Sequence, residues 1–191
     1  LVDGDYVARY GALQTLTHDT DAHQFVVTMP SGEVWRFNDF SGLASGPLGL
    51  FASRQEPGGA ETSVFEYSGE LITEIRREEV VDGDTVIESF LYDYISGNLQ
   101  SVTLRRQVNG GAWGDIRRAV YSYYTSLSTF GSQDDLETAR LQTPTLSGWE
   151  DTQVYYYRYY LEEETDGFVH GLKFVVNPAT WQTLQAASID P

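Results

Sequence analysis

The chain alternates short runs of aromatic and β-branched residues with polar residues, and turn-forming residues interrupt this pattern roughly every ten positions. Such spacing is typical of antiparallel strands joined by tight turns. Asp82-Gly83 and Asn109-Gly110 supply the positive φ values that hairpin turns need. The pattern predicts an all-β, antiparallel hairpin sheet, with strands near residues 7–16, 24–29, 33–37, 48–54, 63–67, 70–81, 85–94, 98–107, 115–124, 153–161 and 168–176.

Two segments depart from the alternation. Residues 177–187 are predicted to form one short C-terminal helix, because Asn177 can cap it and Pro178 suits its first position. Residues 125–149 carry Ser, Thr, Gly and Pro without strand alternation, so we expect a long excursion there. The whole of residues 1–191 is expected to be one domain, since a single all-β domain can reach this length.

Three segments share one frame, in which an aromatic residue is followed by a turn glycine and then by leucine. They are residues 6–16, 65–75 and 92–102. The frame is typical of a hairpin in which glycine takes the turn conformation and leucine restarts the next strand, packed beneath the aromatic ring. The predicted structural repeat positions are Tyr10, Gly11, Leu13, Tyr67, Gly69, Leu71, Tyr92, Asp93, Gly97 and Leu99.

At these positions the sequence resembles the YD-repeat (Rhs-repeat) family, whose unit runs roughly Tyr-x-Tyr-Asp, two residues, then Gly-Arg-Leu. Phe90-Leu91-Tyr92-Asp93-Tyr94 followed by Gly97-Asn98-Leu99 matches this unit, with Asn98 in place of arginine and one extra residue before the glycine. The order of larger blocks along nearly the whole chain is similar to very large Rhs-like surface proteins of planctomycete-type bacteria. These blocks are residues 29–40, 117–124, 134–139, 155–160 and 170–176.

The resemblance implies a structural role. In the family the repeats form a spiralling β-sheet that closes into a hollow shell, so this chain would be a wall segment of such a shell or spiral, extracellular or at the cell surface. Its partners would be adjacent repeats of the same polypeptide, because a chain that starts without Met reads as a segment of something longer. Its terminal strands would then be edges open to self-association.

Charge narrows the choice of partners. Lys and Arg number 12 against 28 Asp and Glu, which gives a net charge of −16. A field of this sign repels phosphate backbones and anionic lipid, so we expect no nucleic-acid partner. No apolar run approaches the roughly 20 residues that span a bilayer, so we expect no membrane insertion. The chain has no cysteine, which excludes thiol chemistry and leaves its redox compartment open.

The sequence predicts no catalytic, cofactor-binding or metal site and no enzymatic activity. His18, His23 and His170 lack any ligand spacing, so we expect them to have structural or surface roles. The sequence contains no Gly-x-Ser-x-Gly motif, so a catalytic serine would lack the turn that usually exposes it. The acidic turns are weak candidates for Ca²⁺, without the twelve-residue frame of an EF-hand. These turns are Asp3-Gly4-Asp5, Asp19-Thr20-Asp21 and Asp82-Gly83-Asp84.

Two other functions stay open. A glycan-binding module would use exposed Tyr and Trp rings, and residues 155–160, with five tyrosines, are the candidate platform. The competing interpretation is that alternate tyrosines pack in the core and against neighbouring strands. A polysaccharide hydrolase would need two carboxylates facing each other in a cleft, and the many acidic residues do not exclude such a pair.

Overall fold

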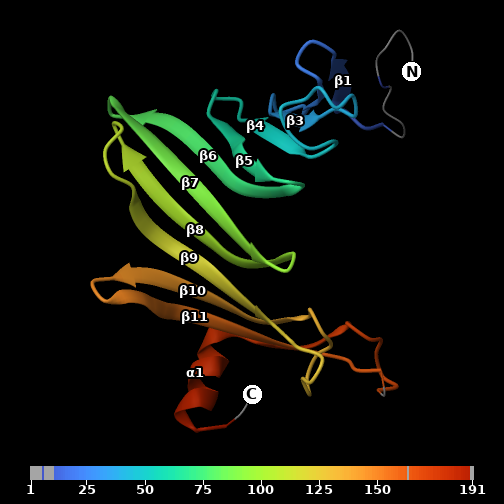
Figure 1. Cartoon of the computed structure of the whole chain (residues 1–191), viewed down its shortest axis with the longest axis vertical. Coiled ribbons are helices and arrows are strands. Elements are labelled where there is room, and N and C mark those ends of the chain that lie inside the picture. Colours follow the sequence, from blue (N-terminus) through green and yellow to red (C-terminus); the bar gives the residue numbers. More distant parts are fainter. Residues whose placement is uncertain (1–5, 7–10, 163, 190–191) are drawn as a thin grey trace. The chain divides into compact units, whose positions relative to one another are not determined.

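The computed structural model describes residues 6, 11–162 and 164–189. Within them the chain forms twelve strands and one helix (Figure 1). The elements are β1 (Thr15–Asp19), β2 (Gln24–Thr28), β3 (Val34–Asn38), β4 (Phe51–Gln55), β5 (Glu61–Ser68), β6 (Leu71–Val81), β7 (Asp84–Ile95), β8 (Asn98–Val108), β9 (Gly114–Tyr123), β10 (Leu136–Thr145), β11 (Gly148–Tyr159), β12 (Leu172–Val176) and α1 (Pro178–Ala186).

The strands follow one another in the sheet in the order of the sequence, from β1 to β12. Consecutive strands from β1 to β7 and from β9 to β12 pair antiparallel through hairpins or short loops. Gly11, Gly69 and Gly97 all lie in turns with positive φ, as the repeated frame predicted. The all-β antiparallel fold with sequential hairpins is therefore confirmed.

The contacts of the chain fall into two compact units. The first unit comprises Leu1–Leu91 together with Arg105–Gly114, and the second comprises Tyr92–Leu104 together with Asp115–Pro191. Strands β7 and β8 each contribute residues to both units. Each unit is described by itself below.

The structure corrects the expectation of a long excursion over residues 125–149. Strand β10 occupies Leu136–Thr145 inside this range and pairs with both β9 and β11. On one face of β10 the residues are Thr138, Arg140 and Gln142, none of which is apolar. The strand therefore lacks the hydrophobic alternation by which a strand is predicted from sequence. Of the predicted excursion, an irregular connection remains between Tyr123 and Leu136.

The predicted C-terminal helix is confirmed at Pro178–Ala186. The side chain of Asn177 caps it by accepting a hydrogen bond from the backbone N–H of Thr180 at 2.9 Å. The helix packs against β11 (Figure 1). The ring of Trp181 lies 5.7 Å from that of Tyr156. None of the described residues belongs to a helix with the length and apolar character needed to cross a membrane.

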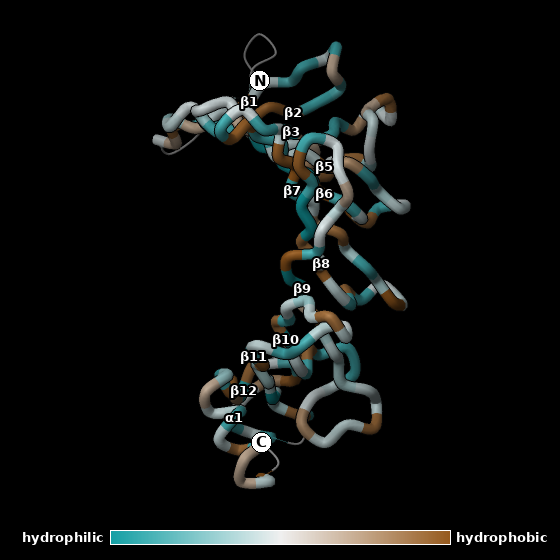
Figure 2. Tube along the Cα trace, turned by 90° about the vertical axis from the view of Figure 1, so that its left-hand side faces the viewer, coloured by the Kyte–Doolittle hydropathy of each residue, from teal (hydrophilic) through white to brown (hydrophobic). Residues whose placement is uncertain are grey.

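Few apolar side chains are buried. Among the described residues, the buried hydrophobic side chains are Leu104, Tyr124 and Tyr156, whereas the buried polar ones are Asn38, Asp39, Ser53, Glu74, Ser89 and Thr138. Apolar and polar residues alternate along the strands of each unit (Figure 2). Because alternate strand residues point to opposite faces, each unit exposes apolar side chains where no second layer lies over them. The interior is correspondingly polar.

This burial pattern corrects one detail of the repeated frame. Leu13 is 76% exposed and Leu71 is 38% exposed, so the expected packing of the frame leucine beneath an aromatic ring was wrong at Leu13 and incomplete at Leu71. Leu99 is part-buried. The frame therefore specifies the turn more than it specifies the packing.

Gly97→Ala should destabilise the fold by about 1 kcal/mol, because φ is +87° there and a Cβ is strained in the left-handed region. Gly58→Ala is the matched control, since Gly58 lies outside that region and a Cβ would meet no atom within 4 Å at either position. Urea titration of both variants checks this. Equal losses of stability would show that the turn conformation at Gly97 is not the cause.

Candidate functional site

The first unit is organised around a buried carboxylate. Glu74 on β6 is 4% exposed. Its Oε1 accepts hydrogen bonds from Arg76 Nε at 2.7 Å, from the Ser89 hydroxyl at 2.6 Å and from Arg105 Nη2 at 3.0 Å. Glu74 and Arg76 share a face of β6, and Ser89 stands opposite Arg76 on β7. Three neighbouring strands thus converge on one oxygen.

Two aromatic side chains cover the arginines of this cluster. The Arg76 guanidinium lies 3.2 Å from the centre of the Phe65 ring, and that of Arg105 lies 4.2 Å from the centre of the Trp113 ring. Burial alone would raise the pKa of Glu74, but the hydrogen bonds from Arg76, Ser89 and Arg105 outweigh it and lower that pKa. Glu74 therefore stays ionised, and its charge is matched by two cations held under rings.

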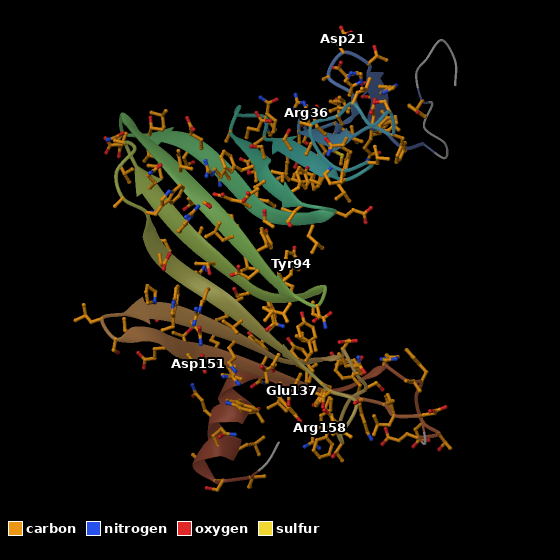
Figure 3. All side chains as sticks on the ribbon, in the orientation of Figure 1. Asp21, Arg36, Tyr94, Glu137, Asp151 and Arg158 are labelled. Atoms are coloured by element: carbon orange, nitrogen blue, oxygen red, sulfur yellow. The ribbon has the colours of Figure 1, made fainter. Side chains whose placement is uncertain are left out.

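Arginine over an aromatic ring recurs through both units. The further pairs, with the distance from the guanidinium to the ring centre, are Arg54 with Trp35 at 5.7 Å, Arg118 with Trp149 at 4.4 Å and Arg158 with Phe130 at 3.5 Å. Figure 3 shows side chains projecting from the strands of each unit, with Arg158 labelled in the second. Arg54 also pairs with Glu33 and Arg118 with Gln142, whereas the buried Nε of Arg158 has no hydrogen-bond partner among the described residues. Reasoning from the sequence missed this feature, although arginines within predicted strands were a visible signal.

A second cluster surrounds Asp39, which follows β3 and is 1% exposed. Its Oδ1 accepts a hydrogen bond from the Ser41 hydroxyl at 2.6 Å. Its Oδ2 lies 2.9 Å from His18 Nε2 and 3.7 Å from His23 Nδ1. The hydrogen bonds from Ser41 and His18 lower the pKa of Asp39 to about 2. His18 and His23 thus approach the same buried carboxylate, a contact that their spacing in the sequence did not predict.

The geometry around Asp39 stabilises the fold but does not activate a nucleophile. In a catalytic triad the imidazole takes the proton of the serine hydroxyl, and the carboxylate orients the imidazole. Here the Ser41 hydroxyl donates directly to Asp39, whose low pKa makes it a poor base, and His23 Nδ1 is 3.4 Å from Ser41 Oγ. The described residues also contain no group of three His, Asp or Glu side chains arranged to hold a metal ion.

The predicted repeat positions make hydrogen bonds to neighbouring strands. Tyr67 donates its hydroxyl to the carbonyl of Phe51 at 2.6 Å, and Asp93 accepts the hydroxyl of Ser101 at 2.9 Å. Burial raises the pKa of Tyr92. Tyr10 lies outside the described residues. These contacts support turns and strands rather than a shared binding site.

The acidic turns use their carboxylates to support the backbone and neighbouring side chains. Asp19 accepts the N–H groups of Asp21 at 3.1 Å and Ala22 at 2.9 Å. Asp84 accepts the side-chain amide of Asn109 at 2.7 Å. Residues 3–5 lie outside the described part of the chain. Calcium binding at these turns stays a prediction.

The tyrosine run of β11 divides between two faces. Tyr156 is 6% exposed and lies beside Trp181 of α1, and its hydroxyl accepts a hydrogen bond from Tyr124 at 2.9 Å. Burial, followed by this hydrogen bond, raises the pKa of Tyr124. Tyr155 and Tyr157 point to the opposite face and are part-buried. The face of β11 that carries Tyr156 therefore packs against α1.

Neither a scan against protein-family models nor a search of curated proteins finds a match to this chain. The YD-repeat interpretation therefore rests on the residues of the repeated frame and on the sequential hairpin order.

Glu74→Gln should lower the free energy of unfolding by about 3 kcal/mol. Arg76 and Arg105 would stay largely buried but would lose the negative charge that balances them. Glu88→Gln is the control, since Glu88 pairs with Arg106, whose side chain is 49% exposed, and such a pair contributes about 0–1 kcal/mol. Urea titrations of both variants measure the difference. A loss for Glu74→Gln no larger than that for Glu88→Gln would contradict the role assigned to the cluster.

The Asp39 cluster should make stability depend on acid pH. Because folding lowers the pKa of Asp39 from 3.8 to about 2, its contribution is fully present above the unfolded value and is lost as pH falls through this window. The urea midpoint of wild type should exceed that of Asp39→Asn above about pH 4, and the gap should shrink towards about pH 2. Asp21→Asn is the control at an exposed carboxylate. A gap that is independent of pH would refute the assignment.

Proposed function

We propose that this chain is a structural segment of a longer YD-repeat β-sheet that adjacent repeats of the same polypeptide extend strand by strand, at the cell surface or outside the cell. The observation that carries the proposal is the last strand of the sheet order. On β12, Leu172 is 54% exposed, Phe174 is 55% exposed and Val175 is 51% exposed. A further strand paired with β12 would bury part of these side chains against its own side chains.

The backbone of β12 supports the same conclusion. Within the described residues β12 pairs with β11 on one side, so its other side presents unpaired N–H and C=O groups. Natural proteins usually protect such an edge with charge, proline or a covering segment. The one charged residue of β12 is Lys173, whose ammonium is held by Glu164. An apolar edge of this kind is suited to pairing.

The buried polar groups also favour a scaffold over a catalyst. Glu74 bonds to Ser89 and Arg105, and Asp39 bonds to Ser41, so these buried carboxylates are engaged in contacts within the fold. A sheet held together in this way does not need a covering layer on each face. It can therefore grow by repetition of hairpins, since each new strand brings its own stabilising contacts.

The proposal predicts that the isolated chain self-associates through β12. Sedimentation at increasing protein concentration should show reversible association, and high salt should favour it by screening the net charge of −16. The double variant Leu172→Lys/Phe174→Lys should raise the dissociation constant at least about tenfold, because it places charges on the edge strand.

The matched control is Val80→Lys/Val81→Lys on β6, a strand inside the sheet order whose Val80 and Val81 pair with Thr85 and Asp84 of β7. Val80 is 72% exposed and Val81 is 45% exposed, so the change of surface chemistry is similar. This control should associate like wild type. A wild-type chain that stays monomeric up to about 1 mM at high salt, or equal effects of the two double variants, would refute the proposal.

A further inference from the structure

The second unit carries a hollow of about 590 Å³, within the range of about 300–1,000 Å³ that is usual for small-molecule sites. It lies among the start of β8, the end of β9 and the connection that follows β9. Its lining combines phenol rings with amide and carboxylate groups, and none of its described lining residues is Lys, Arg or His. The polar and aromatic side chains that matter are Asn98, Gln100, Tyr121, Tyr123, Gln133 and Asp134.

Asp134 lies in a turn that borders this hollow. Its φ is +69°, in the left-handed region that Asp tolerates in turns, and its N–H donates to the carbonyl of Tyr124 at 3.0 Å. Its carboxylate accepts the side-chain amides of Asn98 at 2.8 Å and Gln133 at 3.4 Å. An ionised carboxylate has about four acceptor positions, so Asp134 keeps acceptor capacity for a ligand.

The rings beside Asp134 differ in their roles. Tyr123 donates its hydroxyl to the carbonyl of Leu99 at 2.8 Å, and burial raises the pKa of Tyr123, so this ring is fixed by the sheet. Tyr121 shares the same face of β9 and lines the hollow. Its hydroxyl makes no hydrogen bond to another described residue. Gln100 likewise keeps its amide free among the described residues.

We propose that this hollow binds an uncharged saccharide. Tyr121 offers a ring to the C–H groups of a pyranose, Asp134 accepts from sugar hydroxyls, and the Gln100 amide both donates and accepts. Anionic ligands are disfavoured because the hollow carries a carboxylate without a cation, on a chain of net charge −16. The ring-rich but polar lining also disfavours a purely apolar ligand. This inference does not depend on the scaffold proposal.

Isothermal titration of the full chain tests the site with neutral tetrasaccharides built from glucose, galactose, mannose or N-acetylglucosamine. We expect at least one of them to bind with a Kd on the order of 1 mM or tighter. Tyr121→Ala should weaken binding at least about tenfold, and Tyr121→Phe should weaken it less because the ring remains. Asp134→Asn should also weaken binding at least about tenfold, since it removes charged acceptor capacity.

The control variants are Tyr155→Ala and Asp151→Asn, which change the same residue types outside the lining of the hollow. They should bind like wild type, and urea midpoints establish that each variant is folded. A uronic-acid tetrasaccharide should bind more weakly than its neutral counterpart. The proposal is overturned if no neutral probe binds, if Tyr121→Ala and Asp134→Asn both bind as tightly as wild type, or if a glucosamine tetrasaccharide with free amines binds more tightly than every neutral probe.

Discussion

Apart from α1 on β11, no helix covers the strands in the described part of the chain, so the sheet must shield its own hydrogen bonds, and this constraint governs the side chains of both units. Long arginine stems and aromatic rings lie across the strands, as with Arg76 over Phe65 and Arg105 over Trp113. Guanidinium groups placed this way need acceptors, and the ionised Glu74 provides one. The polar interior therefore follows from the architecture, because a charge can be buried where matching cations surround it.

The same contacts specify strand register. Arg76 stands opposite Ser89, and both reach Glu74 from one face. A slip of one residue would turn one of these partners to the other face and leave the carboxylate without it. Apolar side chains that are only part-buried would not impose this penalty. A sheet whose register is set by polar contacts within three strands can be lengthened by further hairpins, which is the property a scaffold requires.

The sequence predicts local structure here better than it predicts long-range contacts. Turn chemistry at Gly97 and the cap at Asn177 act over a few residues, so the hairpins and the helix could be predicted. Strand β10 could not, because Thr138 and Arg140 occupy positions where periodicity looks for apolar residues. His18 and Asp39 are 21 residues apart in the sequence, and their contact depends on the pairing of three strands. No sequence motif could therefore predict this cluster. The hollow beside Asp134 likewise arises only when β8 and β9 have folded.

The heat-capacity change of unfolding, measured by differential scanning calorimetry, tests most directly whether polar contacts replace a hydrophobic core. This quantity rises with the apolar surface that unfolding exposes and falls with the polar surface. An ordinary globular protein of 191 residues gives roughly 2.3–2.9 kcal/mol/K, from about 12–15 cal/mol/K per residue. Our account predicts a value clearly below that range. A value within or above it would mean that buried apolar surface stabilises this sheet as it does a conventional domain, and would contradict the account.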